Sequence, residues 1–256
     1  MRPDTSFLDF DGKWVLVTGA SSGIGRAIAI ELSRHRARVI LSGRDEGRLA
    51  ETSRQLTPNG HQVLPLDLVD HSRIVPAILK LRERIGRIYG LCHSAGVVET
   101  RPLSSNSVEV VQSMLAVHVL AGLELARAIC RRDVIEEEGG SVLFISSVYG
   151  RVGMPGQTGY CASKGAISAA VRALAVELAR RKIRVNSISP GLVKTEMTQK
   201  ALGLLSKEQV ENLEQNHPLG VGAPEDVAKA AVFLLAPDNP WITGADLTVD
   251  GGFSAH

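Results

Sequence analysis

The chain has 256 residues, 44% of them hydrophobic, and a formal net charge of +2, which suits one α/β domain with a large core. Its basic runs, around Arg34 and from Arg180 to Arg184, lie where helices are expected to end, and they form no basic stripe with interleaved aromatic residues. Binding to nucleic acid is therefore not expected.

The three cysteines, Cys92, Cys130 and Cys161, are widely spaced and odd in number, so the sequence predicts neither a disulfide framework nor a metal site. The N-terminus lacks an apolar run of signal-peptide length, and no later segment has about 18 uninterrupted apolar residues. We expect a soluble protein of the cytoplasm, with no metal and no membrane contact.

Short β-branched runs alternate with longer segments of helical periodicity along the whole chain. The expected strands lie at 14–19, 38–43, 62–67, 88–96, 141–147, 184–191 and 246–252. The expected helices cover about 23–35, 45–56, 71–84, 107–131, 159–181 and 224–235. This alternation predicts an α/β fold with a doubly wound, seven-stranded parallel sheet and helices on both faces.

A glycine-rich turn joins the first expected strand to the first helix in "VLVTGASSGIGRAIA". Glycine permits a tight turn and close approach of the backbone to a pyrophosphate, and a helix N-terminus favours negative charge. A turn without a ligand is the alternative, but the position after the first strand favours a dinucleotide site. The residues expected to contact the cofactor are Gly19, Ser21, Ser22, Gly23, Ile24 and Gly25.

The second expected strand ends at Ser42 and Gly43, and Arg44 follows it. A cofactor with a free ribose 2′-hydroxyl favours Asp or Glu at this strand end, whereas the arginine fork suits a 2′-phosphate. We therefore expect NADP(H) in preference to NAD(H). Asp45 leaves two alternatives open, because its carboxylate could pair with Arg44 or cap the next helix.

Tyr160 and Lys164 lie four residues apart, on one face of the expected helix at 159–181. As a surface pair they would contribute a few tenths of a kcal/mol. In a cleft, a lysine charge about 4 Å from the phenolate, at an effective dielectric of about 20, would lower the tyrosine pKa by about three units. The tyrosine could then exchange a proton near neutral pH.

Residues 194–220 break the alternation with a polar, helix-prone excursion after the sixth expected strand. Ligands of open α/β sheets bind outside the carboxyl ends of the strands, and this segment leaves from such an end. We expect a substrate lid, with an ordinary surface loop as the alternative. Its apolar residues, which are Met197, Leu202, Leu204 and Leu205, predict a pocket that is not strongly polar.

Several spaced motifs together resemble the short-chain dehydrogenases/reductases. They are "TGASSGIG", a serine thirteen residues before the tyrosine, "YCASK", "RVNSISPG" and "ITGADLTVDGG", and the resemblance runs from about residue 12 to 253. It implies one NAD(P)-binding, Rossmann-like domain over 1–256, with the lid at about 194–220. It also implies hydride transfer between NAD(P)H and a carbonyl or alcohol.

The resemblance assigns roles to individual residues by position. Tyr160 is implied to be the general acid in reduction, Ser147 to hold the substrate oxygen, and Lys164 to lower the tyrosine pKa and bind the nicotinamide ribose. A strand-end role for Ser147 and a helix-capping role for Thr195 are the structural alternatives, and Asn186 is expected to support the architecture. The further implied cofactor contacts are Asp67, Leu68, Ala95, Gly96, Pro190, Gly191, Val193 and Thr195.

Two positions depart from the family pattern. "HSAG" replaces the usual "NNAG", so His93 and Ser94 stand where two asparagines are usual, and His93 is expected to replace their hydrogen bonds. His118 stands where an asparagine usually holds a proton-relay water behind the lysine. It is either a structural helix histidine or a relay group, and a relay would give turnover an apparent pKa near the histidine reference of about 6.5.

The segment "PLGVGAPEDVA" is similar to one in 3-oxoacyl thioester reductases, although Val221 stands where arginine is frequent. The expected substrate is thus a small carbonyl or alcohol, carried on acyl-carrier protein or CoA in the thioester case. A keto-sugar, a steroid-like ketone and a small aromatic ketone are alternatives, as is an inactive NADP-binding regulatory protein. By family analogy we expect a homotetramer or homodimer.

Overall fold

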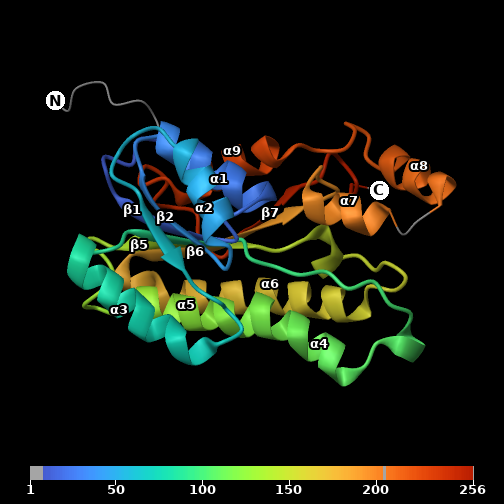
Figure 1. Ribbon diagram of the computed structural model, residues 1–256, viewed down its shortest axis with the longest axis horizontal. Coiled ribbons are helices and arrows are strands. Elements are labelled where there is room, and N and C mark those ends of the chain that lie inside the picture. The colour runs from blue at the N-terminus through green and yellow to red at the C-terminus, as the bar shows by residue number, and fades with distance from the viewer. Residues whose placement is uncertain (1–7, 204–205, 256) are drawn as a thin grey trace.

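The seven expected strands form one parallel sheet in the order β3-β2-β1-β4-β5-β6-β7 (Figure 1). The computed structural model describes residues 8–203 and 206–255. The strands are β1 Trp14–Thr18, β2 Arg38–Gly43, β3 Gln62–Pro65, β4 Gly90–His93, β5 Gly140–Ile145, β6 Ile183–Pro190 and β7 Asp246–Val249. The predicted doubly wound α/β fold is confirmed.

Alternate residues of the central strands face two separate hydrophobic cores. In β1, Val15 and Val17 join one core, while Trp14 and Leu16 join the other. Successive side chains of a strand point to opposite faces, so a strand that is apolar throughout is buried on both sides. The continuous apolar runs of the sequence therefore require helices on both faces.

Two helical layers cover the sheet (Figure 1). One layer contains α1 Gly23–Arg34, α2 Glu46–Arg54 and α9 Pro224–Leu235, with α1 packed against α9. The other contains α3 Ile74–Ile85, α4 Val108–Leu115, α5 Ala121–Ile129 and α6 Thr158–Leu178. In this layer α3 packs against α5, and α4 packs against α6.

The helix expected over 107–131 is interrupted, which corrects the sequence prediction. A π-helical turn, Ala116–Leu120, separates α4 from α5 and contains the buried His118. Such turns bulge one residue out of the helical repeat, often at a functional site. The run Val108–Ile129 is long and apolar enough to cross a bilayer by length and composition, and 28% of its most apolar stretch is buried in the fold.

The sheet order reverses between β1 and β4, and doubly wound sheets bind their ligands in a crevice at such a point, outside the carboxyl ends of the strands. The excursion after β6 forms two helices near that edge, α7 Glu196–Leu202 and α8 Lys207–Gln215 (Figure 1). Its two ends meet, because Lys194 N donates to Gly222 O and Gly222 N donates to Leu192 O. Leu204 and Leu205, which the sequence places in the lid, lie outside the described residues.

Candidate active site

Ser147, Tyr160 and Lys164 come together at the carboxyl end of β5. Ser147 follows this strand and caps a short turn, Val148–Gly150, by accepting a hydrogen bond from Tyr149 N at 3.2 Å. Its hydroxyl also lies close enough to the Tyr160 phenol to lower the pKa of that group. Lys164 lies one helical turn further along α6, and its Nζ is 5.5 Å from the centroid of the Tyr160 ring. The three residues thus form a cluster rather than a surface pair.

The net lowering of the Tyr160 pKa that the sequence predicts is not found, because burial outweighs any effect of Lys164. Burial raises the pKa of Tyr160 to about 12, and the hydrogen bond from Ser147 opposes that rise only in part. Lysine does not dominate because its Nζ is directed elsewhere, donating to Ile145 O at 2.9 Å. At neutral pH, Tyr160 therefore carries its proton.

Lys164 is a buried cation with few compensating contacts. It is 5% exposed, and burial lowers its pKa to about 7. Its Nζ lies beside Gly96, where an added Cβ would be 3.9 Å away. A lysine with this pKa gains and loses a proton near neutral pH. Its ammonium has three N–H groups, so it can donate to further acceptors such as ribose hydroxyls while it donates to Ile145 O.

His118 is held at both ring nitrogens. Its Nε2 accepts a hydrogen bond from Val97 N at 2.9 Å, so its Nδ1 carries the proton and donates to Ser163 Oγ at 2.8 Å. Burial, followed by the charge of Lys164, lowers the His118 pKa to about 2. Of the two alternatives for His118, the structural one fits this geometry better, because a neutral imidazole with both nitrogens hydrogen-bonded does not change charge near pH 6.5.

His93 makes the kind of strand-end hydrogen bonds that were expected of it. Its Nδ1 accepts from Thr18 Oγ1 at 2.9 Å, and its Nε2 donates to Val117 O at 3.1 Å. The same threonine oxygen accepts from the backbone N–H groups of Ser94 and Ala95. Burial and the charge of Lys164 lower the His93 pKa to about 4, which keeps the ring neutral. His93 thus ties the end of β4 to β1 and to the π-helical turn.

The glycine turn packs tightly against neighbouring backbone and leaves N–H donors for a dinucleotide pyrophosphate. Gly19 has φ +66°, and a Cβ there would lie 2.9 Å from the backbone of Ala95. A Cβ on Gly25 would lie 2.3 Å from Gly19 O. Ser22, the N-cap of α1, makes no capping hydrogen bond, and the first turn holds no acidic residue. The N–H groups that open α1 are therefore available to an anion.

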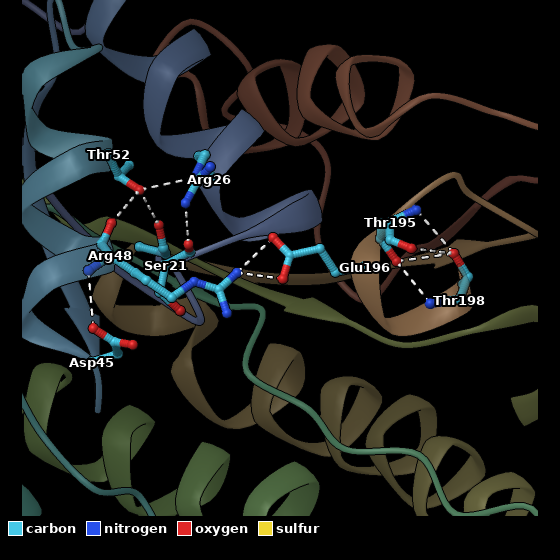
Figure 2. A network of polar contacts seen from close by, with 9 residues as sticks. Ser21, Arg26, Asp45, Arg48, Thr52, Thr195, Glu196 and Thr198 are labelled. Atoms are coloured by element: carbon cyan, nitrogen blue, oxygen red, sulfur yellow. Dashed lines mark hydrogen bonds and ion pairs between the residues drawn. The ribbon is translucent and has the colours of Figure 1, made fainter. Parts of the chain in front are cut away.

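The region after β2 resolves the two alternatives for Asp45. Its carboxylate accepts from Arg48 N at 3.0 Å and caps α2 (Figure 2). Arg44 makes no hydrogen bond or ion pair with its side chain within residues 8–203 and 206–255. Nearby, the Ser42 hydroxyl is buried and, among those described residues, has no hydrogen-bond partner. The carboxylate at this strand end is thus engaged, whereas the guanidinium is not.

The other expected cofactor residues lie around the same crevice with mixed surroundings. Asp67 accepts from Val69 N, while the Leu68 side chain is buried in a core. A Cβ on Gly191, which follows Pro190, would lie 2.9 Å from Asp250 Cα, so glycine is required for packing against the residue that follows β7. Val193 is buried at the base of the excursion. Asn186 binds Ile242 O and Ala245 N, which fits its expected structural role.

Thr195 caps α7 and also touches the glycine turn. It exchanges hydrogen bonds with Thr198, in which Thr195 Oγ1 accepts from Thr198 N and Thr198 Oγ1 accepts from Thr195 N (Figure 2). A Cβ on Gly23 would lie 3.2 Å from the methyl group of Thr195. The capping alternative for this residue is therefore present, together with a contact that places the start of α7 over the turn.

Sequence reasoning missed an ion pair that spans from α2 to α7. Both carboxylate oxygens of Glu196 lie 2.6 Å from Arg48 Nη2 (Figure 2). Arg26 lies close by, donating to Ser21 O and Thr52 Oγ1 (Figure 2). The pair joins residues 148 positions apart, so no local signal could reveal it.

Comparison with known sequences fits this geometry. A family model described as enoyl-(acyl carrier protein) reductase matches residues 19–254. The uncharacterized oxidoreductase YxbG of Bacillus subtilis is 34% identical over 96% of this chain and 92% of its own length. The 3-oxoacyl-(acyl-carrier-protein) reductase FabG of Haemophilus influenzae is 35% identical over 94% of this chain and 98% of its own length. A 2-(S)-hydroxypropyl-CoM dehydrogenase of Xanthobacter autotrophicus is 34% identical over 94% and 96%.

Solved structures agree with these relatives over nearly the whole chain. A short-chain type dehydrogenase/reductase from Mycobacterium marinum has a TM-score of 0.89 and 29% identity, covering 99% of both chains. A dehydrogenase/reductase from Sinorhizobium meliloti has a TM-score of 0.89 and 29% identity, covering 99% of this chain and 100% of its own. The chain therefore belongs to the short-chain dehydrogenase/reductase family, whose members are oxidoreductases that use a nicotinamide cofactor.

Proposed function

We propose that the protein is an NADPH-dependent carbonyl reductase, acting in reverse as a secondary alcohol dehydrogenase. The observation that carries the proposal is the cluster of Ser147, Tyr160 and the buried Lys164 at the carboxyl end of β5. Two hydroxyls that converge on one point can hold and protonate a carbonyl oxygen. The glycine turn, whose N–H groups at the start of α1 have no side-chain cap, supports a nicotinamide cofactor at the carboxyl ends of the strands.

What the protein contributes to the reaction follows from the protonation states of its side chains. NADPH, when bound, supplies the hydride. Ser147 donates a hydrogen bond to the substrate oxygen, and Tyr160, still protonated at neutral pH because its pKa is about 12, gives that oxygen a proton. Lys164 stabilises the phenolate that remains, since a cation within 5.5 Å of the ring favours the charged form. His118 is proposed as a positioning residue that holds Val97 through its Nε2.

The preference for NADPH over NADH rests on Arg44. Its guanidinium makes no ion pair within the described part of the chain, and Asp45 already caps α2. An unengaged arginine fork at the end of β2 suits a 2′-phosphate, and a carboxylate committed to a cap does not compete for a ribose hydroxyl. Asp67, Leu68, Ala95, Pro190, Gly191, Val193 and Thr195 complete the proposed cofactor contacts.

A 3-oxoacyl thioester, on acyl-carrier protein or CoA, is the proposed substrate class. The FabG relative and the "PLGVGAPEDVA" segment support it. The test is NADPH oxidation at 340 nm with acetoacetyl-CoA, compared with a keto-sugar, a steroid ketone and acetophenone. A kcat/KM for acetoacetyl-CoA at least about tenfold above the other three, a transition-state difference of about 1.4 kcal/mol, is expected. A higher value for any other ketone would replace the thioester by that substrate class.

We propose a homotetramer or homodimer in the cytoplasm, with residues 194–220 as a substrate lid. Apolar side chains exposed on two helices support the assembly, namely Val108 on α4 and Val176 on α6, which is 80% exposed. Sedimentation equilibrium should give two or four times the mass of 27.4 kDa. A monomer at micromolar concentration would contradict it.

A further inference from the structure

Asp246, the first residue of β7, lies where three site-bearing segments meet. Its Oδ2 accepts from Arg151 Nε at 3.1 Å and from Ser168 Oγ at 3.0 Å. Its Oδ1 accepts from Ser189 Oγ at 2.8 Å. The side chain of Asp246 is 10% exposed, so one buried carboxylate collects donors from three different elements.

Each donor is attached to a segment that carries part of the active site. Ser168 lies on α6, four residues after Lys164 and eight after Tyr160, on the same helical face. Ser189 immediately precedes Pro190 at the end of β6. Arg151 follows the turn that Ser147 caps.

The link between Arg151 and Ser147 is short and hydrogen-bonded. Gly150 N donates to Ser147 O at 2.9 Å, and Arg151 N donates to Val148 O at 2.8 Å. The Arg151 guanidinium is then fixed on β7 by further bonds, to Asp246 O at 2.7 Å and to Thr248 Oγ1 at 2.9 Å. A displacement of Arg151 would therefore move the turn that holds Ser147.

The carboxylate is suited to this role by charge and by geometry. It is acceptor-only, so both oxygens can take donors from several directions at once. Its bonds to the guanidinium are charge-assisted, which makes them stronger than bonds between neutral groups. An asparagine of the same shape would lose the charge and place an NH₂ group against a donor.

We propose that Asp246 is a positioning residue of the active site, which holds the Ser147 turn, the Tyr160–Lys164 helix and the end of β6 in one register. It acts through Arg151, Ser168 and Ser189 and does not touch the substrate. The consequence for rate rests on the proposed function, whereas the consequence for the Ser147 turn does not.

The test compares Asp246→Asn with Asp9→Asn. Asp9 is a matched control, because its side chain is 8% exposed and accepts from Arg36 Nη1 at 2.7 Å, but it lies just before β1, an interior strand that β4, β5 and β6 separate from β7. Two readouts are taken: kcat and KM with NADPH and acetoacetyl-CoA, and hydrogen–deuterium exchange of peptides that cover 147–157. Arg151→Gln, at a side chain that is 44% exposed, serves if Asp246→Asn does not fold.

Asp246→Asn should lower kcat by about 10- to 100-fold, the cost of a small misplacement of reacting groups, while the KM for NADPH stays within about threefold. Exchange over 147–157 should rise in Asp246→Asn and in Arg151→Gln but not in Asp9→Asn. The double variant that combines Asp246→Asn with Arg151→Gln should have a kcat only slightly below that of Asp246→Asn alone, because both changes break the same network.

The inference is overturned if exchange over 147–157 is the same in Asp246→Asn and Asp9→Asn, or if both variants lose kcat equally. If the wild type does not reduce acetoacetyl-CoA, the proposed substrate class fails. The exchange measurement still decides whether Asp246 positions the Ser147 turn.

Discussion

Lys164 is the residue where function and stability conflict most clearly. Burial lowers its pKa to about 7, and burial, followed by the charge of Lys164, lowers the pKa values of His93 and His118. Both histidines are therefore neutral at pH 7, and both ring nitrogens of each are hydrogen-bonded. The site therefore contains one cation that costs free energy to bury and two imidazoles that stay uncharged.

Replacing Lys164 by Met should stabilise the fold while removing activity. The folded chain binds fewer protons at this lysine than the unfolded chain between about pH 7 and the usual lysine value, so the penalty is complete below pH 7 and fades as pH rises toward about 10.4. We expect Lys164→Met to raise the unfolding free energy by roughly 2–4 kcal/mol at pH 6, and by less at pH 9. Urea denaturation measures both values.

The exposed Lys207 provides the control for this prediction. Its side chain is 92% exposed, so Lys207→Met should change the unfolding free energy by less than about 0.5 kcal/mol. A Lys164→Met variant that is less stable than the wild type at pH 6 would refute the account of the buried charge.

His118→Asn should leave the pH profile of kcat unchanged in shape. With a pKa of about 2, His118 stays neutral across the working range, so its removal should delete no limb near pH 6.5. The rate itself should fall modestly, because an asparagine Oδ1 can still accept from Val97 N. Loss of a limb near pH 6.5 in the variant would restore the relay interpretation.

Arg44→Ala should shift cofactor preference. We expect the KM for NADPH to rise by about tenfold or more and the KM for NADH to stay within about twofold, because only the phosphorylated cofactor uses the fork. Arg54, on the same stretch of chain but paired with Glu51, is the control and should tolerate alanine. Equal losses for both cofactors with Arg44→Ala would place the 2′-phosphate elsewhere.

At the scale of elements, the Arg48–Glu196 pair connects α2 to the first residue of α7. The side chains are 42% and 55% exposed, so the pair contributes little stability, about 0–1 kcal/mol. Its position matters more than its energy. It links the helix after β2 to the start of the lid, beside the glycine turn that Thr195 covers (Figure 2).

Glu196→Gln should therefore loosen the lid without unfolding the protein. We expect a thermal midpoint within about 3 °C of the wild type and faster release of NADP⁺, measured by stopped-flow fluorescence. The difference in release rate should shrink at 1 M NaCl, where exposed ion pairs are screened within about 3 Å. An unchanged release rate at low salt would mean that the pair does not restrain the lid.

At the scale of the whole molecule, the periodicity of the apolar residues was enough to predict the sheet and the helices that cover it. Apolar runs of strand length predict the seven strands, and the glycine turn predicts that the site lies at the carboxyl ends of the strands. Helix α9 begins and ends where it was expected. The π-helical turn at His118 and the network around Asp246 were not predicted. Both depend on packing between segments far apart in the chain, as does the burial that raises the Tyr160 pKa.

The position of the site residues was thus more predictable than their charge. Spacing brought Tyr160 and Lys164 to one helical face, but the lysine Nζ turns to Ile145 O rather than to the phenol. Desolvation, which no sequence pattern measures, then decides which groups carry protons.

The central claim is that Tyr160 gives the proton in an NADPH-linked reduction. The direct measurement is NADPH oxidation by the wild type and by Tyr160→Phe over the panel of four ketones, with NADPH binding followed by fluorescence. We predict that the wild type reduces at least one ketone, while Tyr160→Phe binds NADPH and loses about 100-fold or more of the rate. Equal rates in the two proteins, or NADPH binding without turnover by the wild type, would contradict the claim, and the second result would favour a regulatory NADP-binding protein.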